Sequence, residues 1–233
     1  MPFPEPFAMP AASGQLLLVM AAGWDESAAR LQRFERDSGG VGWQLVGPAI
    51  AVTLGRAGMA WGRGLQVLAD STDRAKREGD GRAPAGVFPV TALFGYGGPP
   101  PGAKLPWLQA TPDLKCIDDP ASRHYNRIVD CRRVEGTDWN SCEDMLRHDR
   151  RYELGAVVGC NCEPVLAGAG SCIFLHVWES EGAPTAGCTA MAPADMRQVA
   201  SWLDGARSPL LVQLPRAAYE RLRGPWALPD FPS

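Results

Sequence analysis

The sequence lacks the features that mark several classes of protein. No apolar run reaches the length of about 20 residues that a membrane-spanning helix needs, and Leu16 to Ala22 is far too short. No basic field is present either, because 23 Lys and Arg face 26 Asp and Glu and leave a net charge of −3. These absences argue against a transmembrane segment and against nucleic acid as a partner.

Signals for export and for metal binding are also weak. Residues Met1 to Pro6 carry no basic region, so as they stand they do not form a secretory signal peptide. Histidine is scarce, with three scattered along the chain. The Cys-x-Cys spacing of Cys160 and Cys162 is poor for zinc, although a zinc site completed by Cys172 or His176 remains an alternative. We therefore expect no metal.

Cysteine, in contrast, is well represented. The chain has 7 cysteines, at positions 116, 131, 142, 160, 162, 172 and 188. If Cys188 is a reactive thiol, the others suffice for up to three disulfides, with 15 possible pairings. Such a number is typical of an oxidising compartment such as the periplasm. A set of reduced, buried cysteines is the alternative.

Glycine and proline are abundant, at 26 and 21 residues, and favour a loop-rich β structure over a helical bundle. Short apolar runs bounded by turn residues predict strands, over residues 15–21, 28–36 (or a short helix), 43–46, 49–54, 87–94, 124–130, 152–159, 171–178 and 210–214. Helices are expected over 194–203, 217–222, the charged stretch 73–78 with a solvated face, and from 142 onward. The predicted fold is mainly β, a mixed curved β-sandwich with a few short peripheral helices.

The length of 233 residues fits one principal domain. We expect an extended N-terminal arm over 1–14 and a catalytic domain over 15–215. A C-terminal helix and Pro-rich tail over 216–233 would pack on the same domain.

The segment from Ser171 to Trp178 is the most informative part of the chain. Read as a strand, it places His176 on one face with Cys172, Phe174 and Trp178, while Ile173, Leu175 and Val177 share the other face. Both faces are largely apolar, which predicts a central strand covered on both sides. The loop that follows is short enough to bring Cys188 back beside His176.

Cysteine and histidine in this arrangement suit nucleophilic catalysis. The Cys188 thiol, with an ordinary pKa of roughly 8.5, would be the nucleophile, and His176 would act as general base and then as general acid. Gly187 would leave room for a substrate carbonyl and help aim backbone amides at an oxyanion. A helix beginning near Pro193 would favour the thiolate. The alternative is a core histidine beside a small buried cysteine.

Two segments resemble parts of one enzyme family. Residues 174–177 (Phe-Leu-His-Val), followed by 184–191 (Pro-Thr-Ala-Gly-Cys-Thr-Ala-Met), resemble the active-site segment of the L,D-transpeptidase catalytic domain, the YkuD-like family. Upstream, residues 82–90 resemble the Thr-Pro-x-Gly-x-Phe strand of that family. The similarity extends from about residue 15 to 215.

The sequence departs from the family pattern next to the cysteine. Thr185-Ala186-Gly187-Cys188 stands in place of Ser/Thr-His-Gly-Cys, so Ala186 replaces a histidine. Ala190 stands where Arg or Asn is often found, and the loop between His176 and Cys188 is shorter than usual. The resemblance retains the nucleophile and the base but not the groups near the cysteine that bind a carboxylate.

The resemblance implies acyl transfer on peptidoglycan stem peptides through a thioester on Cys188, with no cofactor. Hydrolysis of the same thioester, giving an L,D-endo- or carboxypeptidase, is the alternative. A non-catalytic cell-wall-binding module is a third reading, made credible by Ala186 and Ala190. We expect a monomer in the periplasm or at the cell wall, with the export signal missing from this chain or export by another route.

Residues 112–150 supply further candidates for substrate binding. Tyr125, Asn126, Arg127 and Trp139 are of the kinds that hold a polar peptide or sugar, and Thr185 joins them beside the cysteine. The structural alternative is that Trp139 anchors the core and Asn126 forms a turn.

Overall fold

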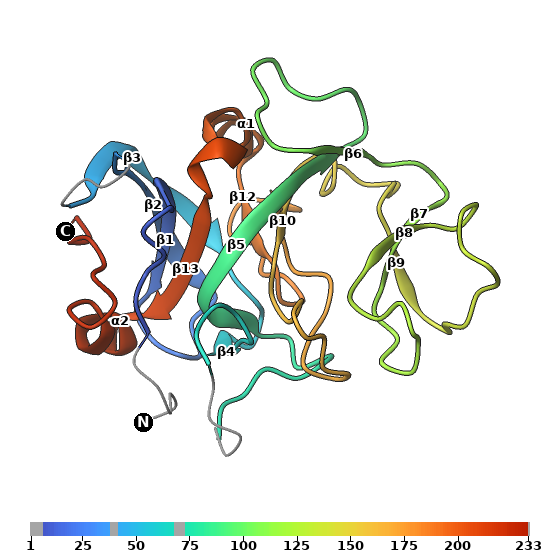
Figure 1. Ribbon diagram of the computed structural model, residues 1–233, viewed down its shortest axis with the longest axis horizontal. Coiled ribbons are helices and arrows are strands. Elements are labelled where there is room, and N and C mark those ends of the chain that lie inside the picture. The colour runs from blue at the N-terminus through green and yellow to red at the C-terminus, as the bar shows by residue number, and fades with distance from the viewer. Residues whose placement is uncertain (1–6, 38–41, 68–72, 233) are drawn as a thin grey trace.

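The computed structural model describes residues 7–37, 42–67 and 73–232. In these ranges β-strands predominate over helices (Figure 1). The strands are β1 (Gln15–Ala21), β2 (Ala28–Glu35), β3 (Gln44–Thr53), β4 (Met59–Trp61), β5 (Ala83–Gly95), β6 (Trp107–Gln109), β7 (Leu114–Ile117), β8 (Ile128–Asp130), β9 (Cys142–Asp144), β10 (Leu154–Val158), β11 (Phe174–Val177), β12 (Thr189–Met191) and β13 (Leu210–Pro215). The helices are α1 (Pro193–Trp202), α2 (Arg216–Leu222) and a 3-10 turn at Gly205–Arg207. The expected mainly β fold with few helices is confirmed.

The main sheet closes on itself. Its strand order is β10-β11-β12-β3-β2-β1-β13-β5, and β5 pairs in turn with β10, while β4 and β6 extend the edges along β5. The pairing is mixed, because β1 and β13 run parallel, as do β11 and β12, whereas β1–β2 and β13–β5 are antiparallel. This closure leaves one enclosed interior for apolar side chains.

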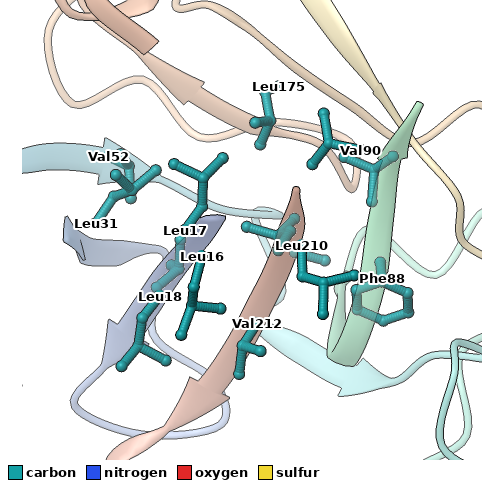
Figure 2. Packing of buried hydrophobic residues seen from close by; sticks show 14 of the residues in the cluster. Leu16, Leu17, Leu18, Leu31, Val52, Phe88, Val90, Leu175, Leu210 and Val212 are labelled. Carbon is teal, nitrogen blue, oxygen red and sulfur yellow. The ribbon is translucent and has the colours of Figure 1, made fainter. Parts of the chain in front are cut away.

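The strands of this sheet fill that interior with aliphatic residues. All seven residues of β1 are buried, which fits a continuous apolar run in a strand covered on both faces. Figure 2 shows leucines of β1 packed beside Leu210 and Val212 of β13 and Val90 of β5. Leu175 of β11 joins the same cluster, so the interior extends to the strand that carries His176.

Strand β11 has the two faces that the alternation predicts. Leu175 and Val177 belong to the main core. Phe174 lies in a second cluster with Cys172 and Cys188. Every residue of β11 is buried, and the strand lies between β10 and β12. The prediction of a central, doubly covered strand is therefore confirmed.

A separate three-stranded sheet, in the order β8-β7-β9, is built from the segment between β6 and β10. It stands apart from the closed sheet, at the right of Figure 1. A disulfide joins Cys116 of β7 to Cys172, just before β11, with a Cα–Cα distance of 5.9 Å. The second cluster of buried residues lies between the two sheets, since it includes Cys116 together with Phe94 of β5.

Several local predictions were wrong. Residues 142–144 form strand β9 rather than the start of a helix, and only Ile128–Asp130 of the expected strand 124–130 is extended. Residues 73–78 form turns and a bridge, and Lys76 is buried instead of solvated. Lys76 is accommodated because its ammonium group pairs with Asp80 at 2.6 Å.

Strand β3 runs unbroken through Gly47 and Pro48, where two strands were expected. The register shift between Leu31 and Arg33 of β2 marks an irregularity opposite this point. Gly47 has a φ of +64°, which a glycine adopts without a steric cost.

The C-terminal part packs on the closed sheet. Helix α2 buries Ala218, Tyr219 and Leu222, and Trp226 and Leu228 beyond it are also buried. In the expected N-terminal arm, residues 1–6 lie outside the described residues, while Met9 is buried in the main core. None of the helices in the described ranges is long and apolar enough to span a bilayer.

Candidate active site

Parallel pairing of β11 and β12 brings Cys188 back to β11. Two parallel neighbours begin at the same end of the sheet, so the loop after Val177 must return to where β11 starts. In the observed register Leu175 lies opposite Thr189 and His176 opposite Ala190. Cys188, just before β12, therefore lies beside Phe174, whose backbone N–H donates to the Cys188 Sγ at 3.3 Å.

His176 lies on the same face of β11, two residues beyond Phe174, a rise of about 7 Å. His176 and Cys188 both line one cavity of about 110 Å³. The cavity is lined by Glu143, Arg147, Arg151, Tyr152, His176, Glu179, Ala183, Pro184, Thr185, Ala186, Cys188 and Ala190. The two side chains are almost enclosed, since Cys188 is 8% exposed and His176 is 5% exposed.

The His176 ring is held in one orientation by its own strand. Nδ1 lies 2.7 Å from the Val177 carbonyl oxygen. A carbonyl only accepts, so the neutral ring donates from Nδ1 and presents Nε2 as a proton acceptor. Burial lowers the His176 pKa to about 4, outweighing the hydrogen bond to Val177, which raises it. At neutral pH the ring is therefore an uncharged base.

The Cys188 thiol is also uncharged at rest. Burial raises its pKa far above the ordinary range, and the nearby Glu143 carboxyl adds to this, while the Phe174 N–H opposes it. The expected contribution from a helix N-terminus is missing, because strand β12 separates Cys188 from the start of α1 at Pro193. At neutral pH the two groups are therefore a neutral thiol and a neutral imidazole.

Thr185 fixes the turn that leads into Cys188. Its hydroxyl donates to the Cys188 carbonyl oxygen at 2.6 Å and accepts from the Gly187 N–H at 3.0 Å. The Gly187 amide is thus engaged within the turn. A Cβ at Gly187 would lie 3.1 Å from the Arg82 carbonyl oxygen, so close backbone packing is the structural reason for a glycine here.

The charged residues that line the cavity were not predicted from the sequence. Glu143 comes from β9, and its carboxylate accepts a hydrogen bond from the Tyr152 hydroxyl. Burial raises the Glu143 pKa, against the lowering effect of that hydrogen bond. The Tyr152 ring meets the His176 ring edge-on, with centroids 5.3 Å apart. Tyr152, just before β10, thus contacts both the imidazole and Glu143 of the three-stranded sheet.

Two arginines complete this lining, and both pair with Asp149. Arg147 reaches the Asp149 carboxylate at 3.0 Å and Arg151 reaches it at 2.6 Å. The sequence offered only a run of mixed charge over 147–151, which is the usual pattern of a solvated surface. The convergence of the two guanidinium groups depends on a tight turn in which the Arg151 N–H donates to Asp149 Oδ1 at 3.0 Å.

Comparison with protein families gives one match to the chain. The model of the L,D-transpeptidase catalytic domain (YkuD) matches residues 25–212. The chain belongs to this family. Comparisons with curated proteins and with solved structures gave no significant match. The family acts on peptidoglycan, which makes the cavity with Cys188 and His176 the candidate active site of an L,D-transpeptidase domain.

Four of the residues predicted to bind substrate lie outside this cavity of the L,D-transpeptidase domain. Tyr125 is buried and donates to the Glu78 carboxylate, which also accepts from Ser171 at 2.7 Å. Asn126 donates to the carbonyl oxygens of Cys160 and Asn161 at 2.8 Å each. These contacts tie the segment before β8 to the main body, so both side chains have structural partners.

Arg127 and Trp139 also lie outside the cavity. Arg127 is exposed. The half-buried Trp139 meets the His124 ring edge-on at 5.8 Å. Of the five predicted substrate-binding residues, Thr185 is the one that lines the cavity, and its hydroxyl is engaged in the turn.

The disulfide leaves Cys188 as the one free thiol in the second cluster of buried residues. Cys172 is bonded to Cys116, whereas Cys188 is free. Cys131, Cys142, Cys160 and Cys162 are free as well. Cys172 is therefore not available to the zinc site considered above, and within the described ranges no group of three potential metal ligands occurs.

Removing the disulfide is expected to destabilise the L,D-transpeptidase domain. The bond closes a loop of 56 residues, for which chain entropy predicts a loss of about 4 kcal/mol in the free energy of unfolding. We expect this loss in a Cys116→Ala/Cys172→Ala variant, measured by urea unfolding. Cys131→Ala, which removes a free thiol near the same sheet, is the control. Equal stability of the two variants would contradict the prediction.

Burial of His176 predicts a loss of stability at acidic pH. The unfolded chain takes up a proton at this position below its ordinary pKa of 6.5, while the folded domain takes it up only near pH 4. As the pH falls between these values, the free energy of unfolding falls with it, by up to about 3 kcal/mol. Urea unfolding at pH 7 and pH 4.5 should show a smaller pH effect in His176→Gln than in wild type. Exposed His148→Gln serves as the control, and an undiminished pH effect in His176→Gln would refute the assignment.

Proposed function

We propose that this protein is an acyltransferase that acts on peptidoglycan stem peptides through a thioester on Cys188. Membership of the L,D-transpeptidase family supports the substrate class and the reaction type. The observation that carries the proposal is the cavity shared by the one free thiol of the second buried cluster and an uncharged imidazole. A neutral base in the same cavity as a neutral thiol is a competent starting point for coupled proton transfer.

The first half-reaction forms the thioester. The Cys188 sulfur attacks a peptide carbonyl carbon of the stem while its proton passes to Nε2 of His176. The resulting imidazolium then gives this proton to the leaving amine as the carbon–nitrogen bond breaks. The Val177 carbonyl fixes the ring by accepting from Nδ1, so that Nε2 carries the proton both ways.

The backbone at Cys188 is the proposed oxyanion donor. The Gly187 N–H is already donated to Thr185, so the sequence-based role of Gly187 is modified to that of a close-packed residue in the turn. We assign the Cys188 N–H to the developing negative charge on the substrate oxygen. Thr185 supports this donor by holding the Cys188 carbonyl at 2.6 Å.

The second half-reaction decides between transfer and hydrolysis. In transfer, an acceptor amine attacks the thioester carbonyl, its proton passes to His176, and the sulfur leaves and regains a proton. Water in place of the amine gives the hydrolytic alternative. A non-catalytic wall-binding protein would form no thioester at all, and the raised pKa of Cys188 and the alanines at 186 and 190 favour this third possibility.

Mass spectrometry separates these outcomes. The protein is incubated with a purified muropeptide and an amine acceptor, and both products and intact protein are weighed. A cross-linked product and an acyl adduct on Cys188 are expected. Release of free stems without cross-links would reject transfer in favour of hydrolysis. An unmodified Cys188, even after exposure to a carbapenem, would reject both enzymatic readings.

A further inference from the structure

The active-site cavity carries its positive charge on residues outside the cysteine motif. Among the described residues that line it, Arg147 and Arg151 are the permanent cations. The segment that contains Cys188 contributes alanines at 183, 186 and 190 and Pro184, which have no hydrogen-bonding side chain, and Thr185, whose hydroxyl is engaged within the turn. Any recognition of an anionic substrate group in this cavity therefore depends on the segment between β9 and β10.

The two arginines are held in place by one carboxylate. Arg147 donates hydrogen bonds from its Nε and Nη2 to the Asp149 carboxylate. Arg151 donates to the same carboxylate from its own Nε and Nη2. The Asp149 backbone carbonyl accepts from the Tyr96 hydroxyl at 2.6 Å, which ties this turn to the end of β5. The Arg147 guanidinium also lies over the Tyr152 ring, 5.2 Å from its centroid. Such a braced pair has little conformational freedom to lose when a ligand binds.

One carboxylate does not neutralise two guanidinium groups. Burial disfavours the charged form of Asp149, but hydrogen bonds from Arg147 and Arg151 outweigh it and hold the Asp149 pKa well below its ordinary value. Asp149 thus supplies a single full negative charge. Glu143 also lines the cavity, but burial raises its pKa and so disfavours its charged form. Glu179 is an outer partner, 3.7 Å from Arg151 Nη1 with its side chain 67% exposed. Solvent screens that weak pair, so a ligand can displace it at little cost.

We propose that Arg147 and Arg151 bind a carboxylate of the substrate and so select a peptide that carries a free carboxylate near the bond that Cys188 attacks. The Nη1 atom of each arginine lies outside the bonds to Asp149 and is the donor assigned to this carboxylate. Guanidinium groups suit the task because they present several N–H donors in one plane. This assignment rests on the proposed function for the identity of the attacked bond and names the substrate class of that same site.

Alkylation of Cys188 tests the assignment without any peptide turnover. Iodoacetate and iodoacetamide both alkylate a thiol: a bond forms between sulfur and the CH2 carbon, and iodide and the thiol proton are released. Only iodoacetate carries a carboxylate. The rate ratio of the two reagents at Cys188, normalised to 2-mercaptoethanol, measures the preference for an anion. We expect Arg147→Gln/Arg151→Gln to lower this ratio about tenfold, the size of a good charge-assisted pair. The iodoacetamide rate should change little.

Arg150→Gln is the matched control. It removes the same charge one residue away, from an exposed side chain that pairs with Glu153 and does not line the cavity. Its ratio should equal that of wild type. A ratio that the double variant leaves unchanged, or that Arg150→Gln lowers equally, overturns the proposal.

A second measurement on unmodified protein covers the case in which the double variant does not fold. N-acetylglycine should protect Cys188 from iodoacetamide, and N-acetylglycinamide should not; equal protection by both, or by neither, overturns the proposal. The outcomes also separate the two levels of inference. If Cys188 prefers the anionic reagent but stem peptides do not acylate it, the arginine site stands and the proposed reaction is rejected. If stem peptides acylate Cys188 but no preference for the anion is found, the proposed reaction stands and the arginine site is rejected.

Discussion

Replacing Cys188 with serine is expected to lower turnover of a stem peptide by roughly 10³-fold or more. The substitution is nearly isosteric, so the fold should be retained. A serine hydroxyl is a far weaker nucleophile than a thiol, and the neutral His176 beside it is not activated by a buried carboxylate partner of its own. Product formation by mass spectrometry and acyl adducts on the intact protein both measure the loss.

Cys162→Ser provides the matched control for this experiment. It makes the same chemical change at an exposed, free cysteine outside the cavity. Turnover in this variant should equal that of wild type. If Cys188→Ser retained wild-type turnover, the thioester mechanism would be refuted, since no other free thiol lines the cavity among the described residues.

Replacing His176 with glutamine is expected to lower turnover by about 10²- to 10⁴-fold, the usual contribution of general acid–base catalysis. Glutamine retains a polar group of similar reach but does not accept and return a proton near neutral pH. Because burial holds the Cys188 thiol in its neutral form, attack without a base should be especially slow. Alkylation of Cys188 by iodoacetamide at pH 7 should slow as well.

The pH dependence of turnover separates a base from a purely structural residue. With its pKa near 4, His176 should remain an active base well below pH 6, so the acidic limb of wild-type turnover should lie near pH 4. His176→Gln should have no such limb, and exposed His148→Gln should retain it. An acidic limb near pH 6.5 would show that a solvated histidine, rather than the buried one, controls the reaction.

The core of the fold was predictable because its signals are local. Strand β11 alternates between two apolar faces, and the packing of Leu175 and Val177 on one side and Phe174 on the other follows directly. In helix α1, Met196, Val199 and Ala200 recur with helical spacing, and all three are buried. Cys188 and His176 were predictable as candidates because two motifs occur in the right order along the chain.

The three-stranded sheet was not predictable in the same way. Its strands are three or four residues long, which is too short to show the alternation of apolar and polar side chains that marks a strand. Its attachment depends on contacts that no local pattern encodes, namely the Cys116–Cys172 disulfide and the side chain of Asn126. Glu143 was therefore read as part of a helix, and its place in the cavity was missed. The pairing of Arg147 and Arg151 on Asp149 was hidden for the same reason.

The parallel pairing of β11 and β12 also bears on how this active site tolerates insertions and deletions in evolution. The register of the two strands, with His176 opposite Ala190, sets the spacing between His176 and Cys188; the number of residues in the connecting loop does not. We therefore expect that residues lost from 180–182, which lie outside the cavity lining, would leave the sulfur in place relative to the ring. One residue added between Cys188 and β12 would instead disturb this alignment, because strand side chains alternate. Shortening of the loop between β11 and β12 is thus compatible with function as long as the pairing of the two strands is kept.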